Sequence, residues 1–90
     1  MAVYVDAPVW EWRGRRWCHL LADTDEELHA FAAGLGLKRA WFQHREERPW
    51  QDHYDIPEEL REEAVRSGAV EVDMHHVAAH LRARRARMRR

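Results

Sequence analysis

Two pairs of histidine and aspartate residues stand where extended segments of this sequence are expected to end. His19 and Asp23 are four positions apart, and His53 and Asp55 are two positions apart. Even spacing along a strand directs both members of each pair to one face. Imidazole and carboxylate groups bind zinc, manganese or iron, and such an ion would activate a water molecule near neutral pH. The four residues therefore predict a metal site, with a hydrogen-bonded His–Asp network as the alternative.

Two further residues are candidates for catalytic acid–base groups beside this site. Asp6 follows the first expected strand and caps no obvious helix, whereas His29 flanks the apolar face of the first expected helix. Asp55 and Asp73 also end extended segments, but aspartate is common at such positions as the N-cap of a following helix. Capping is therefore the alternative explanation for those two residues, and Asp6 is the more informative aspartate.

The elements that would position these side chains alternate between strand and helix. Extended segments are expected at 2–6, 17–22, 53–55 and 69–72. Helices are expected at 24–34, from about Pro57 to Gly68, and after Asp73 with a weakening pattern past Arg84. This order favours a small single α/β domain with a short, mostly parallel sheet and about three helices. Ligands of open parallel sheets bind beyond the carboxyl ends of the strands, so we expect the aspartates to converge there.

Three tryptophans interleave with three arginines in one short segment: Trp10, Trp12 and Trp17 with Arg13, Arg15 and Arg16. We expect a loop here rather than an additional strand. Aromatic faces and guanidinium groups together suit bases and phosphates, but tryptophans that cover the edge of the core beside solvated arginines are the favoured explanation. Arg13 and Arg16, together with Arg61, are the candidates for holding an anionic substrate, because guanidinium groups match phosphate oxygens.

The net charge of −1 conceals an acidic body and a basic end. Positions 1–81 carry sixteen acidic and nine basic residues, a net charge of −7, whereas positions 82–90 carry six arginines. We expect one domain over residues 1–84 and a frayed basic tail over residues 85–90. The tail could bind the phosphates of a nucleic acid, fold back on the acidic body or stay disordered.

The composition favours a cytoplasmic protein. Cys18 is the only cysteine, so no disulfide can form within the chain, and a small domain without disulfides is typical of a reducing compartment. The N-terminal residues do not resemble a signal peptide, and no apolar stretch approaches the ~18 residues that a membrane span needs. We therefore expect no membrane partner, a buried Cys18, and a homodimer as one means of stabilising so small a core.

Three histidines on the third expected helix have no assigned role. His76 and His80 are four positions apart, a spacing that can bind a metal. The apolar stripe that includes Met74 and Val77 puts both histidines on the opposite, solvent face, so an exposed polar surface is the favoured interpretation. His75 belongs to no pattern that we can relate to chemistry.

The order of several short motifs resembles a known family. These motifs are Tyr4-Val5-Asp6, His19 with Ala22-Asp23, Glu27-Leu28-His29, Trp41-Phe42-Gln43, His53-Tyr54-Asp55 and Gly68-Ala69. The series, over roughly positions 3–72, resembles domain of unknown function 4031, a family of bacteria and their phages without an established activity. Its polar positions match Asp6, His19, Asp23, Glu27, His29, Gln43, His53, Asp55 and Arg61. The resemblance implies a metal or acid–base site, because this set is rich in histidine and carboxylate groups.

Two classes of function follow from these observations. The first is a small metal-dependent enzyme, a hydrolase of a phosphate-containing substrate, with the two His/Asp pairs as ligands or acid–base groups. The second is a non-catalytic module that binds nucleic acid or protein through the Trp/Arg loop and the basic tail. The negative charge of residues 1–81 argues against extensive contact with nucleic acid, so the enzyme ranks first. A structural subunit without any site is the third possibility.

Overall fold

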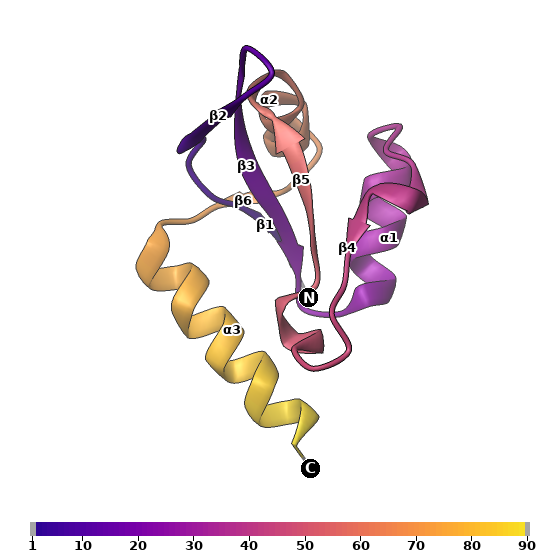
Figure 1. Cartoon of the computed structure of the whole chain (residues 1–90), viewed down its shortest axis with the longest axis vertical. Helices are drawn as coiled ribbons and strands as arrows, with labels where there is room; N and C mark the ends of the chain where they lie inside the picture. Colours follow the sequence, from indigo (N-terminus) through magenta and orange to yellow (C-terminus); the bar gives the residue numbers. More distant parts are fainter. Residues whose placement is uncertain (1, 90) are drawn as a thin grey trace.

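A six-stranded mixed sheet with three α-helices forms the fold of residues 2–89, which the computed structural model describes (Figure 1). The strands are β1 (Val3–Val5), β2 (Trp10–Trp12), β3 (Arg15–Ala22), β4 (Phe42–Gln43), β5 (His53–Pro57) and β6 (Val70–Glu71). The helices are α1 (Asp25–Gly34), α2 (Glu58–Arg66) and α3 (Met74–Met88), and two 3-10 turns, η1 and η2, occupy Arg39–Trp41 and Pro49–Gln51. The expected small α/β domain with three helices is confirmed.

The expectation of a mostly parallel sheet is wrong. The strand order is β4-β5-β3-β1-β6, with β2 also paired to β3, and β1–β6 is the one parallel pair among the described strands. Two antiparallel neighbours flank β3, because the chain turns tightly before it and β5 returns along its other edge. The helix α2 then carries the chain from β5 across β3 and β1 to β6, and this crossover creates the parallel pair.

The Trp/Arg segment is a β-hairpin and not the expected loop. Trp12 pairs with Arg15, which leaves Arg13 and Gly14 as a two-residue turn. Both turn residues have positive φ, 53° for Arg13 and 74° for Gly14. Two positive φ angles are typical of a turn whose twist matches that of the flanking strands. Glycine adopts this backbone without strain, whereas arginine is rare there, so the sequence signal for the hairpin was weak.

An interruption separates β1 from β2 along the same edge of β3. Val5 pairs with Leu20 and Trp10 pairs with Trp17, so the four residues 6–9 stand opposite the two residues 18–19. Extra residues of this kind bend a strand and redirect side chains, and such bulges are common beside functional sites. Asp6 is the first residue of the interruption, and this position brings its carboxylate to β3.

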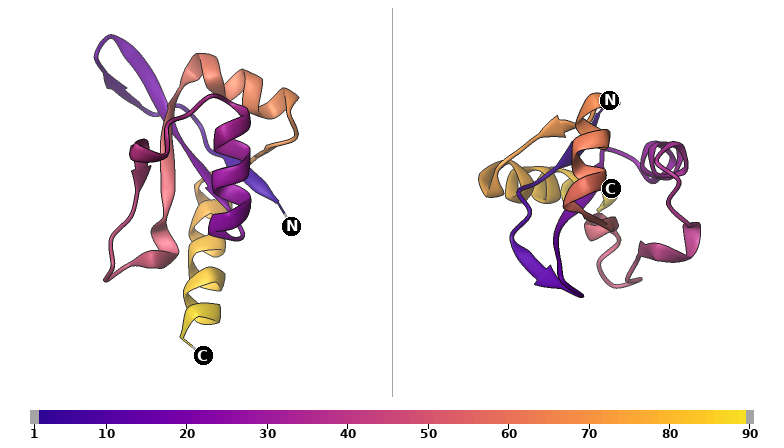
Figure 2. Two further views of the ribbon diagram at one scale, coloured as in Figure 1. Left: turned by 90° about the vertical axis from the view of Figure 1, so that its right-hand side faces the viewer. Right: turned by 90° about the horizontal axis from the view of Figure 1, so that it is seen from above.

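The two faces of the sheet have different environments. One face packs against α1 and α2 and forms the core, and Figure 2 shows these two helices and the strands from two further directions. Its largest fully buried side chains include Leu20, Tyr54 and Ile56. The alternation of side chains along β3 and β5 places His19, His53 and Asp55 on the other face. On this second face α3 packs over the end where Tyr4 lies, and the three polar residues beyond it stay partly exposed.

The third helix is longer and better anchored than expected. It begins after Asp73, whose carboxylate accepts the backbone N–H of His76 at 2.9 Å, as predicted for a helix cap. It continues to Met88, past Arg84, where the apolar pattern weakens. Arg84 is buried and donates to Asp25 at 2.5 Å and to the Ala22 carbonyl at 3.4 Å. These contacts anchor the helix where apolar residues do not.

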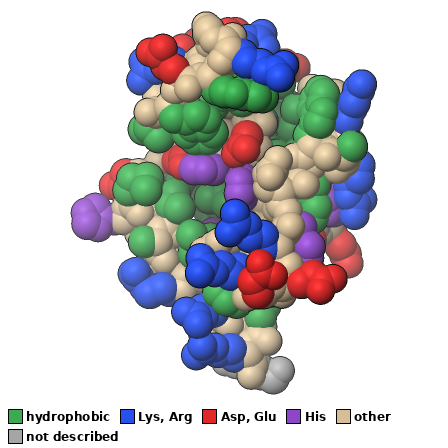
Figure 3. Space-filling view, viewed as in Figure 1, with side chains coloured by type: hydrophobic (Ala, Val, Ile, Leu, Met, Phe, Trp, Pro, Cys, Tyr) green, Lys and Arg blue, Asp and Glu red, His purple; other side chains and the backbone are tan. Residues whose placement is uncertain are grey.

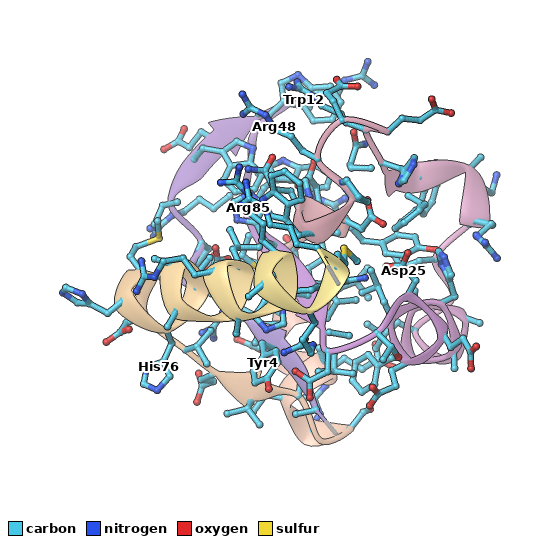
Figure 4. The ribbon with its side chains drawn as sticks, turned by 90° about the horizontal axis from the view of Figure 1, so that it is seen from below. Tyr4, Trp12, Asp25, Arg48, His76 and Arg85 are labelled. Atoms are coloured by element: carbon cyan, nitrogen blue, oxygen red, sulfur yellow. The ribbon has the colours of Figure 1, made fainter. Side chains whose placement is uncertain are left out.

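The basic end of the chain is therefore helical over most of its length. Within positions 85–89 the chain stays helical to Met88, and Arg90 lies outside the described residues. The Arg85 guanidinium packs on the ring of Trp50 at 4.6 Å. In the view from below, Arg85 and Arg48 lie on the same side of α3 as Trp12, and His76 lies toward its other side (Figure 4).

Among residues 2–89, none of the helices combines the length and apolar character needed to cross a bilayer.

Candidate functional site

The candidate site lies in the middle of antiparallel strands and not at parallel strand ends. His19 of β3 stands directly opposite Asp55 of β5, and His53 of β5 stands opposite Gln43 of β4. Asp6, just beyond β1, donates its backbone N–H to the His19 carbonyl at 3.4 Å. Side chains that are opposite each other across strands lie about 5 Å apart. The register of three strands therefore assembles one polar group on the open face.

The buried carboxylate of Asp6 contacts both the backbone and the ring of His19. The Asp6 carboxylate accepts the backbone N–H of His19 at 2.7 Å and lies 2.6 Å from its Nδ1 atom. Asp6 is 1% exposed, and its own carbonyl accepts the Nε–H of Arg61 at 2.7 Å. A buried carboxylate against one ring nitrogen fixes the imidazole orientation and favours a proton on Nδ1. The Nε2 atom of His19 is then the nitrogen available to a ligand.

His53 is oriented in the same way by a backbone carbonyl. Its Nδ1 atom lies 2.7 Å from the Gln51 carbonyl oxygen, and because that oxygen can only accept, Nδ1 must carry a proton. Its Nε2 atom lies 3.3 Å from Oδ1 of Asp55. Burial lowers the pKa of His53, but the Asp55 carboxylate and the Gln51 carbonyl outweigh it, and the net pKa is raised.

Three side chains converge closely enough to share one ion. One ligand atom from each of His19, His53 and Asp55 lies within 4.8 Å of the other two. The two imidazole rings are 5.0 Å apart in an edge-to-face arrangement, and the Trp10 ring packs 4.8 Å from His19. The three side chains are 25–35% exposed. Figure 3 shows histidine and acidic side chains together at the centre of this face, between hydrophobic groups and basic groups.

Asp23, the fourth expected ligand, lies outside this group. It accepts hydrogen bonds from the Ala2 backbone and the Tyr4 hydroxyl, both at 2.9 Å. Four residues along a strand correspond to about 13 Å, so Asp23 shares the face of His19 but not its neighbourhood. The expected convergence depended on parallel strand ends, and the antiparallel register replaces it. Asp23 instead ties the start of β1 to the end of β3.

His29 is also separated from the His19 group, on the other side of the sheet. Its Nδ1 atom lies 2.8 Å from the hydroxyl of Tyr54, and its ring packs edge-on against Phe42. Tyr54 alternates with His53 along β5 and therefore faces α1. Burial, followed by the charge of Arg39, lowers the pKa of His29. The described contacts thus give His29 a place at the edge of the core.

A second polar cluster lies on the His29 side, and the sequence analysis did not find it. Asp52 is 1% exposed and lies 2.7 Å from Nδ1 of His44. Burial and the neighbouring Asp25 carboxyl raise the pKa of Asp52 to about 6, against the opposing effect of His44. Burial raises the pKa of Asp25, but Arg84 outweighs it and the net pKa is lowered. Long-range pairing of this kind leaves no motif in the sequence.

The exposure of His76 and Cys18 agrees with the sequence analysis, and that of His80 does not. His76 is exposed as predicted, but the side chain of His80 is only 11% exposed and lies beside Asp23 and Tyr4. The solvent-facing position predicted for His80 is therefore wrong, because α3 crosses the sheet at the end where Tyr4 lies. Cys18 is fully buried, and burial raises the pKa of its thiol to about 12, so it is a core side chain with little thiolate character.

The three candidate anion-binding arginines have different environments. Arg61 bridges the Asp6 carbonyl and Glu71, with an Arg61–Glu71 distance of 2.9 Å. Arg16 donates to the Pro8 carbonyl at 2.6 Å. Both guanidinium groups are thus bound to the protein itself. Arg13 lies over the Trp12 ring at 4.5 Å and is the one of the three that lines an open cavity beside Asp55.

This cavity, with a volume of about 810 Å³, begins at the candidate site. It lies beside the second half of β5, from Asp55 to Pro57, which has no pairing partner in the short strand β4. The hairpin forms one wall, and the η1 turn with β4 forms another. Its polar and aromatic lining consists of Trp12, Arg13, Arg15, Trp17, Trp41, Gln43 and Asp55. Asp55 therefore belongs both to the cavity lining and to the His/Asp group.

Fold and site together define a small α/β domain that carries a histidine–carboxylate group on the open face of a mixed sheet. The chain belongs to the family described as protein of unknown function DUF4031, whose model matches residues 3–84. This match confirms the resemblance seen in the sequence motifs. No curated protein and no solved structure matches the chain. The family description names no activity, so function has to be argued from the site.

Proposed function

We propose that His19, His53 and Asp55 bind a divalent metal ion and that the protein hydrolyses a phosphate-containing substrate. One observation carries the proposal. Each imidazole has its Nδ1 atom against an oxygen acceptor, Asp6 or the Gln51 carbonyl, so that Nε2 is the nitrogen available for metal binding, and in His53 this atom already faces the Asp55 carboxylate at 3.3 Å. Metal-binding histidines are oriented by such partners in most known sites.

The ligand set fits zinc, manganese or iron. Two neutral imidazoles and one carboxylate are common ligands of these ions, and three protein ligands leave a position open for water or substrate. Ligand atoms about 2.1 Å from an ion in a tetrahedral site lie about 3.4 Å from one another. The present separations of up to 4.8 Å would therefore contract by small side-chain rotations. The partial exposure of all three side chains gives solvent and substrate access.

The surrounding residues have separate roles in this proposal. A bound ion would lower the pKa of a water molecule so that hydroxide is available near neutral pH. Asp6 is buried behind His19 and acts as a positioning residue, not a catalytic one. Arg13 lies at the cavity that adjoins Asp55, where its charge would attract an anionic substrate. The phosphate assignment depends on this arginine and on the positive charge of the ion.

Metal content and hydrolysis measured on the same samples test the proposal. Untagged protein purified without a chelator is expected to contain about one zinc, manganese or iron ion per chain by elemental analysis. It is also expected to hydrolyse bis(p-nitrophenyl) phosphate. His53→Ala should lose both properties, whereas His76→Ala, at an exposed histidine outside the site, should lose neither. Folded protein without metal, also after incubation with zinc and manganese, would contradict the proposal.

A further inference from the structure

The large cavity next to Asp55 is lined by two exposed tryptophans. Trp12 on the hairpin and Trp41 in the η1 turn are 54% and 49% exposed, and they line the cavity from separate elements. Single exposed tryptophans are ordinary on protein surfaces. Two of them on different walls of one cavity provide flat apolar surfaces on which an aromatic ring can stack. The cavity volume lies within the range of small-molecule sites.

The hairpin wall is held in place by hydrogen bonding and packing. The indole N–H of Trp17 donates to the Trp12 carbonyl at 2.8 Å, and the two rings pack 5.5 Å apart. The guanidinium of Arg13 covers one face of Trp12. A wall of this kind loses little conformational freedom when a ligand binds, and this favours affinity.

Polar and charged side chains also line the cavity. Gln43 has both a donor and an acceptor on its side-chain amide, and its one described hydrogen bond, to the Trp41 carbonyl, is long at 3.5 Å. An amide of this type can pair with the edge of a base. Arg13 and Arg15 supply positive charge to the cavity lining. Arg15 lies 3.7 Å from the carboxylate of Glu59, and both side chains of this pair are largely exposed. Asp55 marks the end of the cavity at which the His/Asp group begins.

We infer that this cavity binds the base of a nucleoside phosphate, stacked between Trp12 and Trp41, with the phosphate directed to the His19–His53–Asp55 group. The inference rests on the proposed function for the position of the phosphate and adds the substrate class. Alternating aromatic and guanidinium groups are the usual means by which proteins hold unpaired bases and their phosphates. A free nucleotide and a nucleotide within a single strand share this chemistry.

Calorimetric titration with three small probes tests the inference on the purified full chain. The probes are thymidine 5′-monophosphate, thymidine, and 2-deoxyribose 5-phosphate, which has the phosphate and lacks the base. We expect the nucleotide to bind at least tenfold more tightly than the sugar phosphate. Trp12→Ala and Trp41→Ala should each weaken nucleotide binding roughly fivefold or more, as expected for the loss of a stacked aromatic ring. Neither substitution should change the affinity for the sugar phosphate.

Trp50→Ala is the matched control, because Trp50 packs against Arg85 near α3 and does not line the cavity. Its nucleotide affinity should equal that of the unaltered protein. Equal binding of the nucleotide and the sugar phosphate, no binding of either, or an equal loss in Trp50→Ala would overturn the inference. A twelve-residue thymidylate strand that binds at least tenfold more tightly than the mononucleotide would identify a strand as the source of the base. Equal affinities would identify the free nucleotide.

The same samples separate the inference from the proposed function. Metal binding and phosphodiester hydrolysis without any preference for the base would contradict the nucleotide inference alone. A base preference that depends on Trp12 and Trp41 in protein that binds no metal would contradict the hydrolase proposal. It would leave the cavity as a nucleotide-binding site.

Discussion

The Asp6 carboxylate contacts His19 twice: it accepts the backbone N–H at 2.7 Å and lies 2.6 Å from the imidazole Nδ1 atom. Both contacts arise because Asp6 opens the interruption between β1 and β2 directly beside β3. The first contact fixes the position of Asp6 against the strand, and the second fixes the orientation of the ring. The carboxylate therefore controls which nitrogen of His19 faces the open side of the sheet.

Asp6→Asn is expected to weaken metal binding by roughly 10–100-fold, the usual cost of losing a carboxylate that orients a histidine ligand. The amide can keep the hydrogen bond from the His19 backbone but lacks the charge that supports the ring. Titration of metal-stripped protein with zinc against a chromophoric chelator measures the change. Glu71→Gln, which alters an exposed carboxylate bound to Arg61, is the control and should bind zinc normally. Unchanged affinity in Asp6→Asn would show that Asp6 does not support a metal ligand.

Asp55 and Asp23 are expected to differ sharply although both belong to the sequence motifs. Asp55→Asn should lower zinc affinity by at least tenfold, because Asp55 supplies the carboxylate of the three-residue group. Asp23→Asn should leave zinc affinity unchanged, because Asp23 contacts Tyr4 and the chain start instead. The two variants can be compared in the same chelator competition. Zinc affinity that falls in Asp23→Asn and persists in Asp55→Asn would place the ion elsewhere.

Asp52→Asn is expected to make the protein more stable at neutral pH than the unaltered chain. The folded protein keeps a proton on Asp52 up to about pH 6, whereas an exposed carboxyl releases it near pH 3.8. The folded state therefore loses stability as the pH rises from about 4 to about 6, on the order of 1–3 kcal/mol. Asparagine does not titrate, so this loss should disappear in the variant. The free energies of unfolding of both proteins, obtained by denaturant titration at pH 4 and pH 7, measure this difference.

Asp73→Asn is the control for that experiment, because the pKa of Asp73 is lowered in the folded protein whereas that of Asp52 is raised. The His76 backbone N–H lowers the pKa of Asp73, so its charge stabilises the folded protein above pH 3.8 and less at lower pH. The unaltered chain should therefore gain stability over Asp73→Asn as the pH rises. If Asp52→Asn follows the same trend as Asp73→Asn, burial does not control the titration of Asp52.

Arg84→Met is expected to destabilise the fold by roughly 1–3 kcal/mol, the range for losing hydrogen bonds of a charged group. The substitution leaves Asp25 and the Ala22 carbonyl without their donor on α3. Arg82→Met, at an exposed position on the same helix, should change the free energy of unfolding by less than about 0.5 kcal/mol. Chemical denaturation of both variants provides the comparison. Equal stability of the two would mean that Arg84 does not anchor α3.

Most of the elements could be predicted because their signals are local. Thr24 followed by Glu27 and an apolar period predicts α1, and the Thr24 hydroxyl does accept the Glu27 backbone N–H at 3.2 Å. Asp73 predicts the start of α3 in the same way. The hairpin turn was missed because Arg13 is an uncommon residue at positive φ. The missed hairpin accounts for the antiparallel pairing of β3 with β1 and β2, and the reversal of the chain between β4 and β5 accounts for the antiparallel pairing of β3 with β5.

Residue types and spacing on single strands identified His19, His53 and Asp55 as candidates, because strand alternation is a local property. Whether those residues meet depends on the register between strands, which is set by turns and packing far apart in the sequence. The antiparallel register joins His19 to Asp55 and leaves Asp23 about 13 Å away along β3. The tertiary structure alone also decided that His29 faces the core and that Arg84 is buried against Asp25. The sequence by itself thus determined the chemistry that is available, and the pairing of the strands decided which groups share a site.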